Sequence, residues 1–132
     1  MVKSIERKFF AMQSLTATEE SIMNCIWSLE QDASVADLLT CMKEKYNKEY
    51  ARTTICVFMS YLREKGFVAY RKKSHAYVYH AVISREEYQK DRVNDLLQRC
   101  FDGSLTDLVR TALLVGCPDK AQQEEISSLL TI

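Results

Sequence analysis

A run of apolar residues at helical spacing ends just before a glycine, and two short strand-like segments follow directly. Ile55, Phe58, Met59 and Leu62 lie at positions i, i+3, i+4 and i+7, a spacing that puts apolar side chains on one face of a helix. Gly66 comes next, and its missing side chain suits the left-handed backbone just past a helix end. The order therefore predicts a helix that packs its apolar face inward and leads directly into a hairpin.

Two segments rich in β-branched and aromatic residues make up that hairpin. They are Phe67–Tyr70 and Ala76–Val82, and the polar residues 71–75 separate them. Such segments favour short antiparallel strands, which we expect to be joined by a basic loop. A helix followed by a small hairpin predicts a mainly α fold with a small β wing, of the winged helix-turn-helix type.

Two further helices are expected before this one. Thr16 and Glu19 have the spacing of a capping box, which marks a helix start, and an apolar stripe predicts that this helix runs to about Glu30. Ser34 opens the next helix, whose last turns carry lysines where the helix dipole favours cations. We expect Trp27, Tyr77 and Tyr79 to pack in the core.

After residue 83 the sequence predicts three short amphipathic helices in succession. Such helices cannot bury their apolar faces alone, and a second copy of the chain is the simplest partner. We therefore expect a flexible or loosely helical arm over 1–14, a winged-helix domain over 15–82 and a helical dimerisation domain over 83–132. The expected interface consists of Val93, Leu96, Leu97, Phe101, Leu105, Leu108, Val109, Ala112, Ile126, Leu129 and Leu130.

Charge is unevenly distributed along a chain whose formal net charge is zero. Residues 41–80 hold 9 Lys/Arg against 3 Asp/Glu, a local balance of +6, whereas residues 81–132 hold 6 against 9. A basic region within a neutral protein is typical of a nucleic-acid footprint. The basic footprint is thus confined to one part of the chain.

The cysteines, histidines and glycines limit the other function classes. The 5 cysteines are odd in number and lie far apart, so neither a zinc nor a disulfide pattern can be read from them. The histidines share no metal-ligand spacing with acids or thiols, and 3 glycines leave little room for a phosphate or oxyanion loop. We expect no metal, no cofactor and no catalysis. A secretory signal and a membrane span are not evident, which favours a reducing, cytoplasmic setting.

The outward face of the helix before the hairpin is the expected DNA-reading surface. A recognition helix presents its first turns to base edges, and residues that neutralise phosphates supply affinity without sequence choice. The expected base-reading residues are Arg52, Thr53, Thr54, Val57 and Tyr61. The expected backbone contacts are Lys48, Arg63, Arg71, Lys72, Lys73 and His75.

The chain resembles the penicillinase repressor family of winged-helix regulators, over about residues 15–130. The ordered motifs that carry the resemblance are Leu15-Thr16-x-x-Glu19, Ile22-Met23-x-x-Ile26-Trp27, Thr54-Ile55, Leu62-x-x-Lys65-Gly66-Phe67, Tyr77-x-Tyr79, Ser84-x-Glu86-x-Tyr88 and Phe101-x-Gly103-Ser104-Leu105-x-x-Leu108-Val109. The resemblance implies a transcriptional repressor that binds an inverted-repeat operator as a dimer, with its C-terminal helices forming the interface.

The resemblance also implies an induction mechanism, from which this sequence departs. In the best-known members a membrane β-lactam receptor triggers cleavage at an Asn-Phe bond, and Thr111-Ala112 stands at the matching position here. A copper-responsive branch carries paired cysteines near the C-terminus, where this chain has only Cys117. Cys56 and Val57 replace an Arg-Thr pair that is frequent in the family's recognition helix, so the operator need not be the usual one.

Two other functions fit the residues. Winged helices also serve as protein-interaction modules without touching DNA. A repressor of this kind could instead respond to a small ligand, or to oxidation of Cys56, whose thiol is expected on the outward face of the recognition helix.

Overall fold

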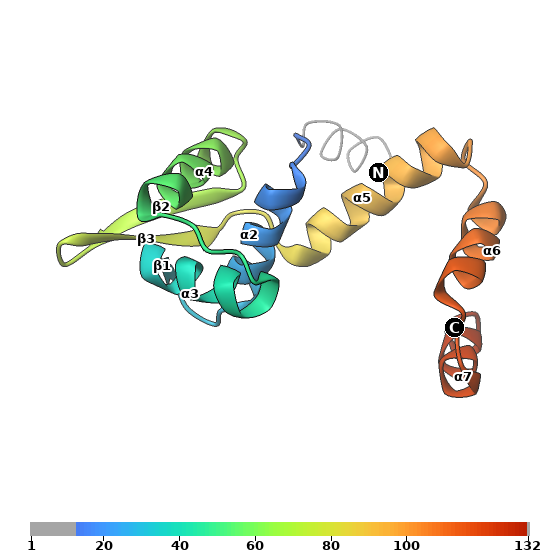
Figure 1. The fold of residues 1–132 in the computed structure, drawn as a ribbon. Coiled ribbons are helices and arrows are strands. Elements are labelled where there is room, and N and C mark those ends of the chain that lie inside the picture. Colours follow the sequence, from blue (N-terminus) through green and yellow to red (C-terminus); the bar gives the residue numbers. More distant parts are fainter. Residues whose placement is uncertain (1–12, 132) are drawn as a thin grey trace. The chain divides into compact units, whose positions relative to one another are not determined.

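The computed structural model describes residues 13–131 and forms a winged helix followed by three helices (Figure 1). The predicted arm over residues 1–14 lies almost entirely outside the described residues. The elements in chain order are α2 (Ala17–Ser28), β1 (Ala33–Ser34), α3 (Val35–Tyr46), α4 (Arg52–Glu64), β2 (Val68–Lys73), β3 (Ala76–Ala81), α5 (Arg85–Cys100), α6 (Leu105–Gly116) and α7 (Lys120–Ser128).

The helix boundaries follow the predicted start and stop signals. Thr16 and Glu19 form the expected capping box at the start of α2, and Ser34 and Asp37 form another at the start of α3. The first helix stops two residues before the predicted Glu30, because Leu29 already has extended backbone. Past the end of α4, Gly66 has φ +82°, the left-handed conformation predicted for it.

The sheet has three antiparallel strands in the order β1-β3-β2. The short strand β1 was not predicted, since two residues carry no alternating pattern. The predicted loop over 71–75 is wrong: Arg71, Lys72 and Lys73 belong to β2 and pair with β3, and only Ser74 and His75 form the turn. As β2 is an edge strand, long cationic side chains are tolerated there without breaking the ladder.

The core lies among α2, α3, α4 and the base of the hairpin. Ile55, Met59 and Leu62 of the predicted stripe are fully buried, and Phe58 packs against them. The largest fully buried side chains elsewhere include Ile22, Met23, Leu38, Met42 and Phe67.

Two of the three aromatic residues expected in the core pack against it. Trp27 stacks near Tyr88 and donates its Nε1–H to the Ile83 carbonyl over 2.9 Å, and Tyr79 packs partly against the core. The expectation for Tyr77 is wrong, because its ring is 52% exposed on the wing. The reason is the longer hairpin, which carries Tyr77 out beyond the helices.

One buried ion pair joins the start of α2 to the end of α4. Lys65 Nζ lies 2.6 Å from Glu19 Oε1, and the Glu19 side chain is 2% exposed. Burial by itself raises the pKa of this carboxyl, but the hydrogen bonds from Lys65 and the Thr16 N–H, with the Lys65 charge, outweigh it. The pKa of Glu19 therefore lies below its ordinary value.

We expect Glu19→Gln to lower the free energy of unfolding by about 2 kcal/mol at neutral pH, because it removes a charge-assisted buried contact. Because the pKa of Glu19 is lower in the folded state, the ionised carboxyl stabilises the fold at pH values above its unfolded-state pKa. This stability is lost as the pH falls through the folded-state pKa. The difference between parent and variant should therefore shrink below about pH 4. Urea unfolding of parent and variant, at neutral pH and below about pH 4, measures the difference in free energy of unfolding. Glu30→Gln, at an exposed position, is the control; an equal effect there would contradict the prediction.

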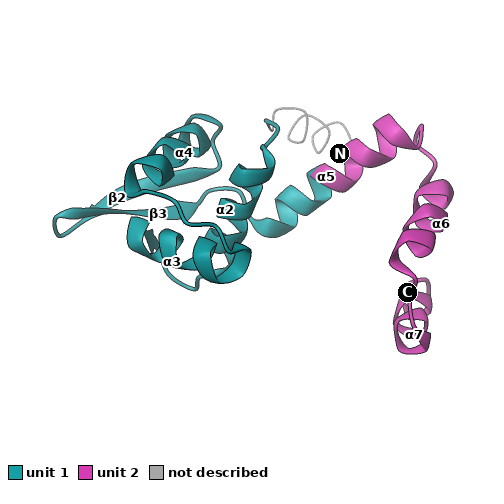
Figure 2. Cartoon of the chain, viewed as in Figure 1, with its two compact units in different colours: residues 1–91 teal, residues 92–132 magenta. Residues whose placement is uncertain are grey.

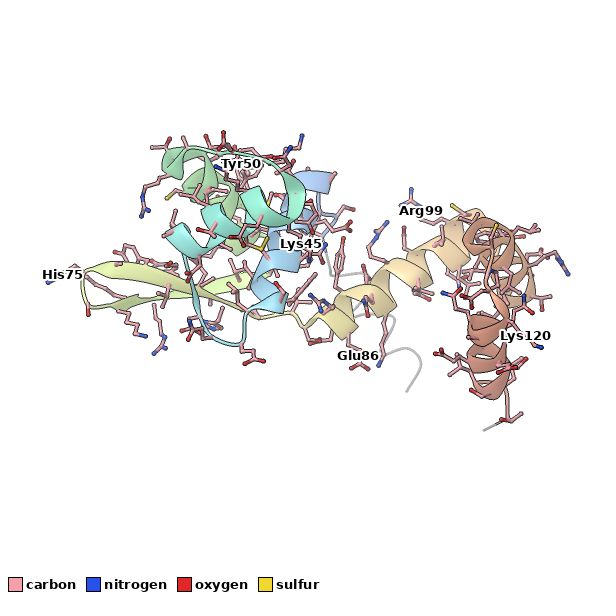
Figure 3. The ribbon with its side chains drawn as sticks, turned by 60° about the horizontal axis from the view of Figure 1, so that its bottom comes forward. Lys45, Tyr50, His75, Glu86, Arg99 and Lys120 are labelled. Atoms are coloured by element: carbon pink, nitrogen blue, oxygen red, sulfur yellow. A yellow bond between two sulfur atoms is a disulfide. The ribbon has the colours of Figure 1, made fainter. Side chains whose placement is uncertain are left out.

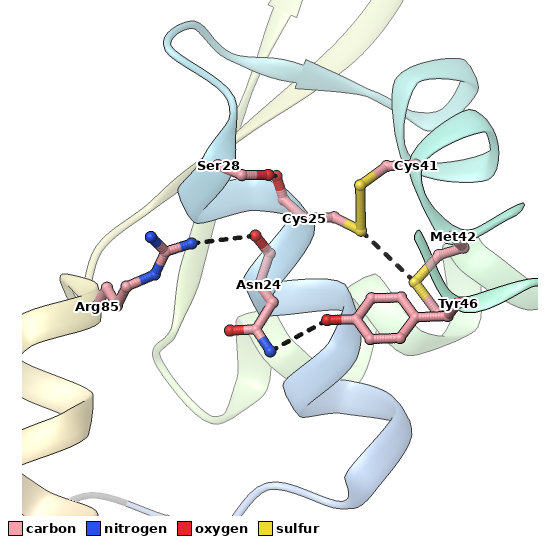
Figure 4. The surroundings of a disulfide bond; sticks show 7 residues. All are labelled: Asn24, Cys25, Ser28, Cys41, Met42, Tyr46 and Arg85. Atoms are coloured by element: carbon pink, nitrogen blue, oxygen red, sulfur yellow. Dashed lines mark hydrogen bonds between the residues drawn. A yellow bond between two sulfur atoms is a disulfide. The ribbon is translucent and has the colours of Figure 1, made fainter. Parts of the chain in front are cut away.

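A disulfide links α2 to α3. It joins Cys25 and Cys41, whose Cα atoms are 6.0 Å apart and which lie 16 positions apart in sequence (Figure 4). No disulfide pattern could be read from the cysteine spacings, so this pair was not predicted. Nothing in the sequence of either helix marks its cysteine as bonded, because only the packing of α2 on α3 brings the two sulfur atoms together.

The described chain divides into two compact units, residues up to Asp91 and residues from Arg92 onward (Figure 2). The division falls within α5, nine residues later than the expected boundary after residue 82. The start of α5 belongs to the first unit because Tyr88 is buried there, with its hydroxyl donating to Glu20 over 2.5 Å and its ring against Phe67.

Candidate nucleic-acid interface

Helix α4 buries one face and presents the other to solvent. The burial of Ile55, Met59 and Leu62 fixes the rotation of the helix about its axis. Of the expected base-reading residues, Thr54 is partly buried, and the others are exposed: Arg52, Thr53, Val57 and Tyr61. The packing of the stripe therefore leaves these side chains accessible to a ligand.

The first turn of α4 differs from those of its neighbours. The N-cap residue is Ala51, which supplies no side-chain acceptor, and the first turn holds no acidic residue. The N-caps of α2, α3, α6 and α7 all accept a backbone N–H through their side chains. The positive end of the α4 dipole is thus left without a local anion, which is a favourable arrangement for a phosphate.

The wing projects as a basic hairpin with His75 at its end (Figure 3). Lys72, Lys73 and His75 are exposed, and within the described residues none of them forms an ion pair. Arg71 is different, since its Nε lies 2.6 Å from Asp32 Oδ2. The charges available to a polyanion therefore lie at the tip, and Asp32 partly neutralises Arg71, two residues before the end of β2.

An aromatic cluster connects the end of α4 to the wing. The Arg63 guanidinium lies over the Tyr70 ring, 4.5 Å from its centroid, and the rings of Tyr77 and Tyr79 lie 5.0 and 6.3 Å from Tyr70. Burial and, to a lesser extent, the negative charge of an ionised Cys56 raise the pKa of Tyr79 above its ordinary value, and the Arg63 charge opposes them. The cluster holds Arg63 between helix and wing. Tyr70 was not among the expected site residues; its position directly before three cationic residues, Arg71, Lys72 and Lys73, was the available signal.

Lys48 lies in the loop between α3 and α4. Its backbone N–H donates to the Met42 carbonyl over 3.2 Å, just after Asn47 ends α3 in the left-handed conformation. The side chain is exposed. The loop therefore places the Lys48 ammonium group on the segment that leads directly into the first turn of α4.

The second unit exposes most of its apolar side chains. None of the residues expected at the dimer interface is buried, and Leu105, Leu129 and Leu130 are 60%, 66% and 86% exposed. Three apolar residues that were not predicted, Leu113, Leu114 and Val115, are exposed as well. An apolar pocket of about 520 Å³ opens between α6 and α7. This much exposed apolar surface is unusual for an isolated chain.

The remaining candidate positions are all accessible. Thr111 and Ala112, the position expected to correspond to the family's cleavage site, are exposed within α6. Cys56 is exposed on α4. Within residues 13–131, no three His, Cys, Asp or Glu side chains come together as a metal site. No helix in that part of the chain is both long and apolar enough to cross a bilayer.

A three-helix core, an outward-facing helix and a two-stranded wing define a winged-helix protein. The chain belongs to the penicillinase repressor family, whose model matches residues 15–132. The family is one of DNA-binding transcriptional repressors. A solved structure titled "The complex structure of hsRosR-S4" is similar, with a TM-score of 0.55 and 16% identity over 92% of this chain and 91% of that chain. At this identity the similarity concerns the fold. A comparison with curated proteins gave no match.

Proposed function

We propose that this protein is a dimeric repressor that reads an inverted-repeat operator with α4 and contacts the DNA backbone with its wing. The observation that carries the proposal is the exposed face of α4, from Arg52 to Tyr61, beside an unpaired basic hairpin tip. Thr and Val methyl groups suit the thymine methyl, and Arg52 suits guanine. Lys48, Arg63 and the wing cations would contact phosphates.

Dimerisation through the second unit is the other half of the proposal. The exposed apolar residues of α6 and α7 support it, because a second copy would remove them from water. A two-fold axis would pair two recognition helices with half-sites about one or more helical turns apart. The family favours a cytoplasmic repressor of a β-lactam-resistance or related stress gene, released by an inducing signal.

Fluorescence anisotropy tests the proposal directly. The titration uses the full chain, an inverted-repeat duplex from upstream of its own gene and a scrambled duplex, over a range of salt concentrations. We expect a preference of roughly a thousandfold for the operator and a steep salt slope. Equal, weak and salt-insensitive binding to both duplexes would instead favour a protein-interaction module.

The wing should supply affinity without sequence choice. Replacing Lys72 and Lys73 by Ala should weaken binding to operator and scrambled DNA by similar factors. The slope of log K against log salt should flatten by about two units, since each phosphate contact contributes about 0.9. Lys90 and Lys120, replaced together, are the control with the same loss of charge outside the proposed surface. A selective loss of operator binding in the wing variant would contradict the assignment.

A further inference from the structure

We propose that Cys25 and Cys41 are a reversible dithiol–disulfide pair oxidised by hydroperoxides, in which Cys41 is attacked first and Cys25 resolves. None of the described residues around the pair belongs to the surface proposed for DNA, and the inference does not depend on that surface. It is also distinct from Cys56, the cysteine singled out by the sequence.

The two sulfur atoms are in unequal surroundings. Cys25 is fully buried in α2, and its Sγ lies 3.7 Å from the Met42 Sδ within the core. Cys41 is partly exposed on α3. An oxidant from solvent can therefore reach Cys41, whereas Cys25 can react only with the sulfur next to it (Figure 4).

A surface pocket gives access to Cys41. It has a volume of about 400 Å³, and Asp37, Glu44 and Lys45 line it together with Cys41. Two carboxylates against one ammonium make the pocket slightly negative. Such a pocket admits a small neutral oxidant and disfavours an anionic one such as oxidised glutathione.

The chemistry takes two steps. The Cys41 thiolate attacks one oxygen of the hydroperoxide, the O–O bond breaks, and the alkoxide or hydroxide leaves, so that sulfur is oxidised to a sulfenic acid as peroxide is reduced. The Cys25 sulfur then attacks the Cys41 sulfur, the S–O bond breaks, and the Cys25 proton leaves with the hydroxyl as water. A dithiol such as dithiothreitol reverses the result by exchange.

The bond also cross-links two helices of the DNA-binding unit. Closing a loop of this length restricts the unfolded chain. Oxidation should therefore raise the melting temperature of the first unit by roughly 10 °C.

Thiol mapping of the full chain tests the proposal. The exposed cysteines Cys56, Cys100 and Cys117 are replaced by Ser to leave only the pair. The protein is reduced, desalted, treated with equimolar hydrogen peroxide, denatured and alkylated with N-ethylmaleimide. We expect two alkylated thiols before peroxide, none after, a monomeric band on a non-reducing denaturing gel, and full recovery with dithiothreitol. Two thiols that stay alkylatable, or an intermolecular bond, would overturn the proposal.

The order of attack is tested in the same background. In Cys25→Ser, dimedone should trap a sulfenic acid at Cys41, and in Cys41→Ser the remaining Cys25 should stay reduced. Dimedone on Cys25 instead would overturn the order.

Oxidised glutathione at equal concentration should oxidise the pair at least tenfold more slowly; an equal rate would overturn the oxidant class. An unchanged melting temperature on oxidation would overturn the stabilising role. These readouts need no DNA, so failure here is distinguishable from failure of the repressor proposal.

Discussion

A Leu108→Asp protein should be monomeric and should lose operator affinity by roughly a hundredfold or more, while its DNA-binding unit stays folded. Leu108 is partly exposed on α6, beside the exposed side chains of Leu105 and Val109. In the proposed dimer a carboxylate there would be taken out of water with no cation to pair with, which is strongly unfavourable. Each monomer would then bind one half-site with half the contacts.

Light scattering after gel filtration measures the mass, and anisotropy measures the affinity. Trp27 is the only tryptophan and packs against Tyr88 in the first unit, so its emission reports whether that unit remains folded. Thr106→Asp adds the same charge at an exposed polar position of α6 and should stay dimeric. A parent protein that is itself monomeric, or a Leu108→Asp monomer with full operator affinity, would refute the coupling of dimerisation to binding.

The elements that sequence reasoning located are those that local signals encode. The capping boxes at Thr16 and Ser34 and the positive φ of Gly66 are properties of a few adjacent residues. The apolar stripe of α4 is likewise defined by residues of a single helix. For this reason the helices, the hairpin and the outward face of α4 could all be predicted.

Most of the features that sequence reasoning missed depend on how separate helices and strands pack together. Strand β1 exists only because Ala33 and Ser34 meet β3 more than 40 positions later. The Cys25–Cys41 bond requires the packing of α2 on α3, and the Arg63–Tyr70 stack requires the wing to fold back toward α4. The extent of β2 was missed for another reason, since the basic residues 71–73 look like a loop in sequence but are tolerated in an edge strand.

A substitution on the outward face of α4 should also have a large effect on operator affinity. A Val57→Glu protein should lose at least a hundredfold in operator affinity with little change in stability, because the new carboxylate would face base edges and phosphates of like charge. Val57 is 48% exposed and lies on the outward face of α4, so the substitution leaves the buried stripe intact. A change on this face should therefore act on binding rather than on folding.

The chain offers a matched control at the opposite end of the hairpin. Val82 is 56% exposed and follows β3, at the far end of that strand from the wing tip. Val82→Glu makes the same chemical change at similar exposure and should keep operator affinity within about threefold, since it adds only one distant charge. If both variants lose affinity equally, net charge explains the effect and α4 is not the reading surface. If only Val57→Glu loses it, then the outward face of α4 meets the DNA.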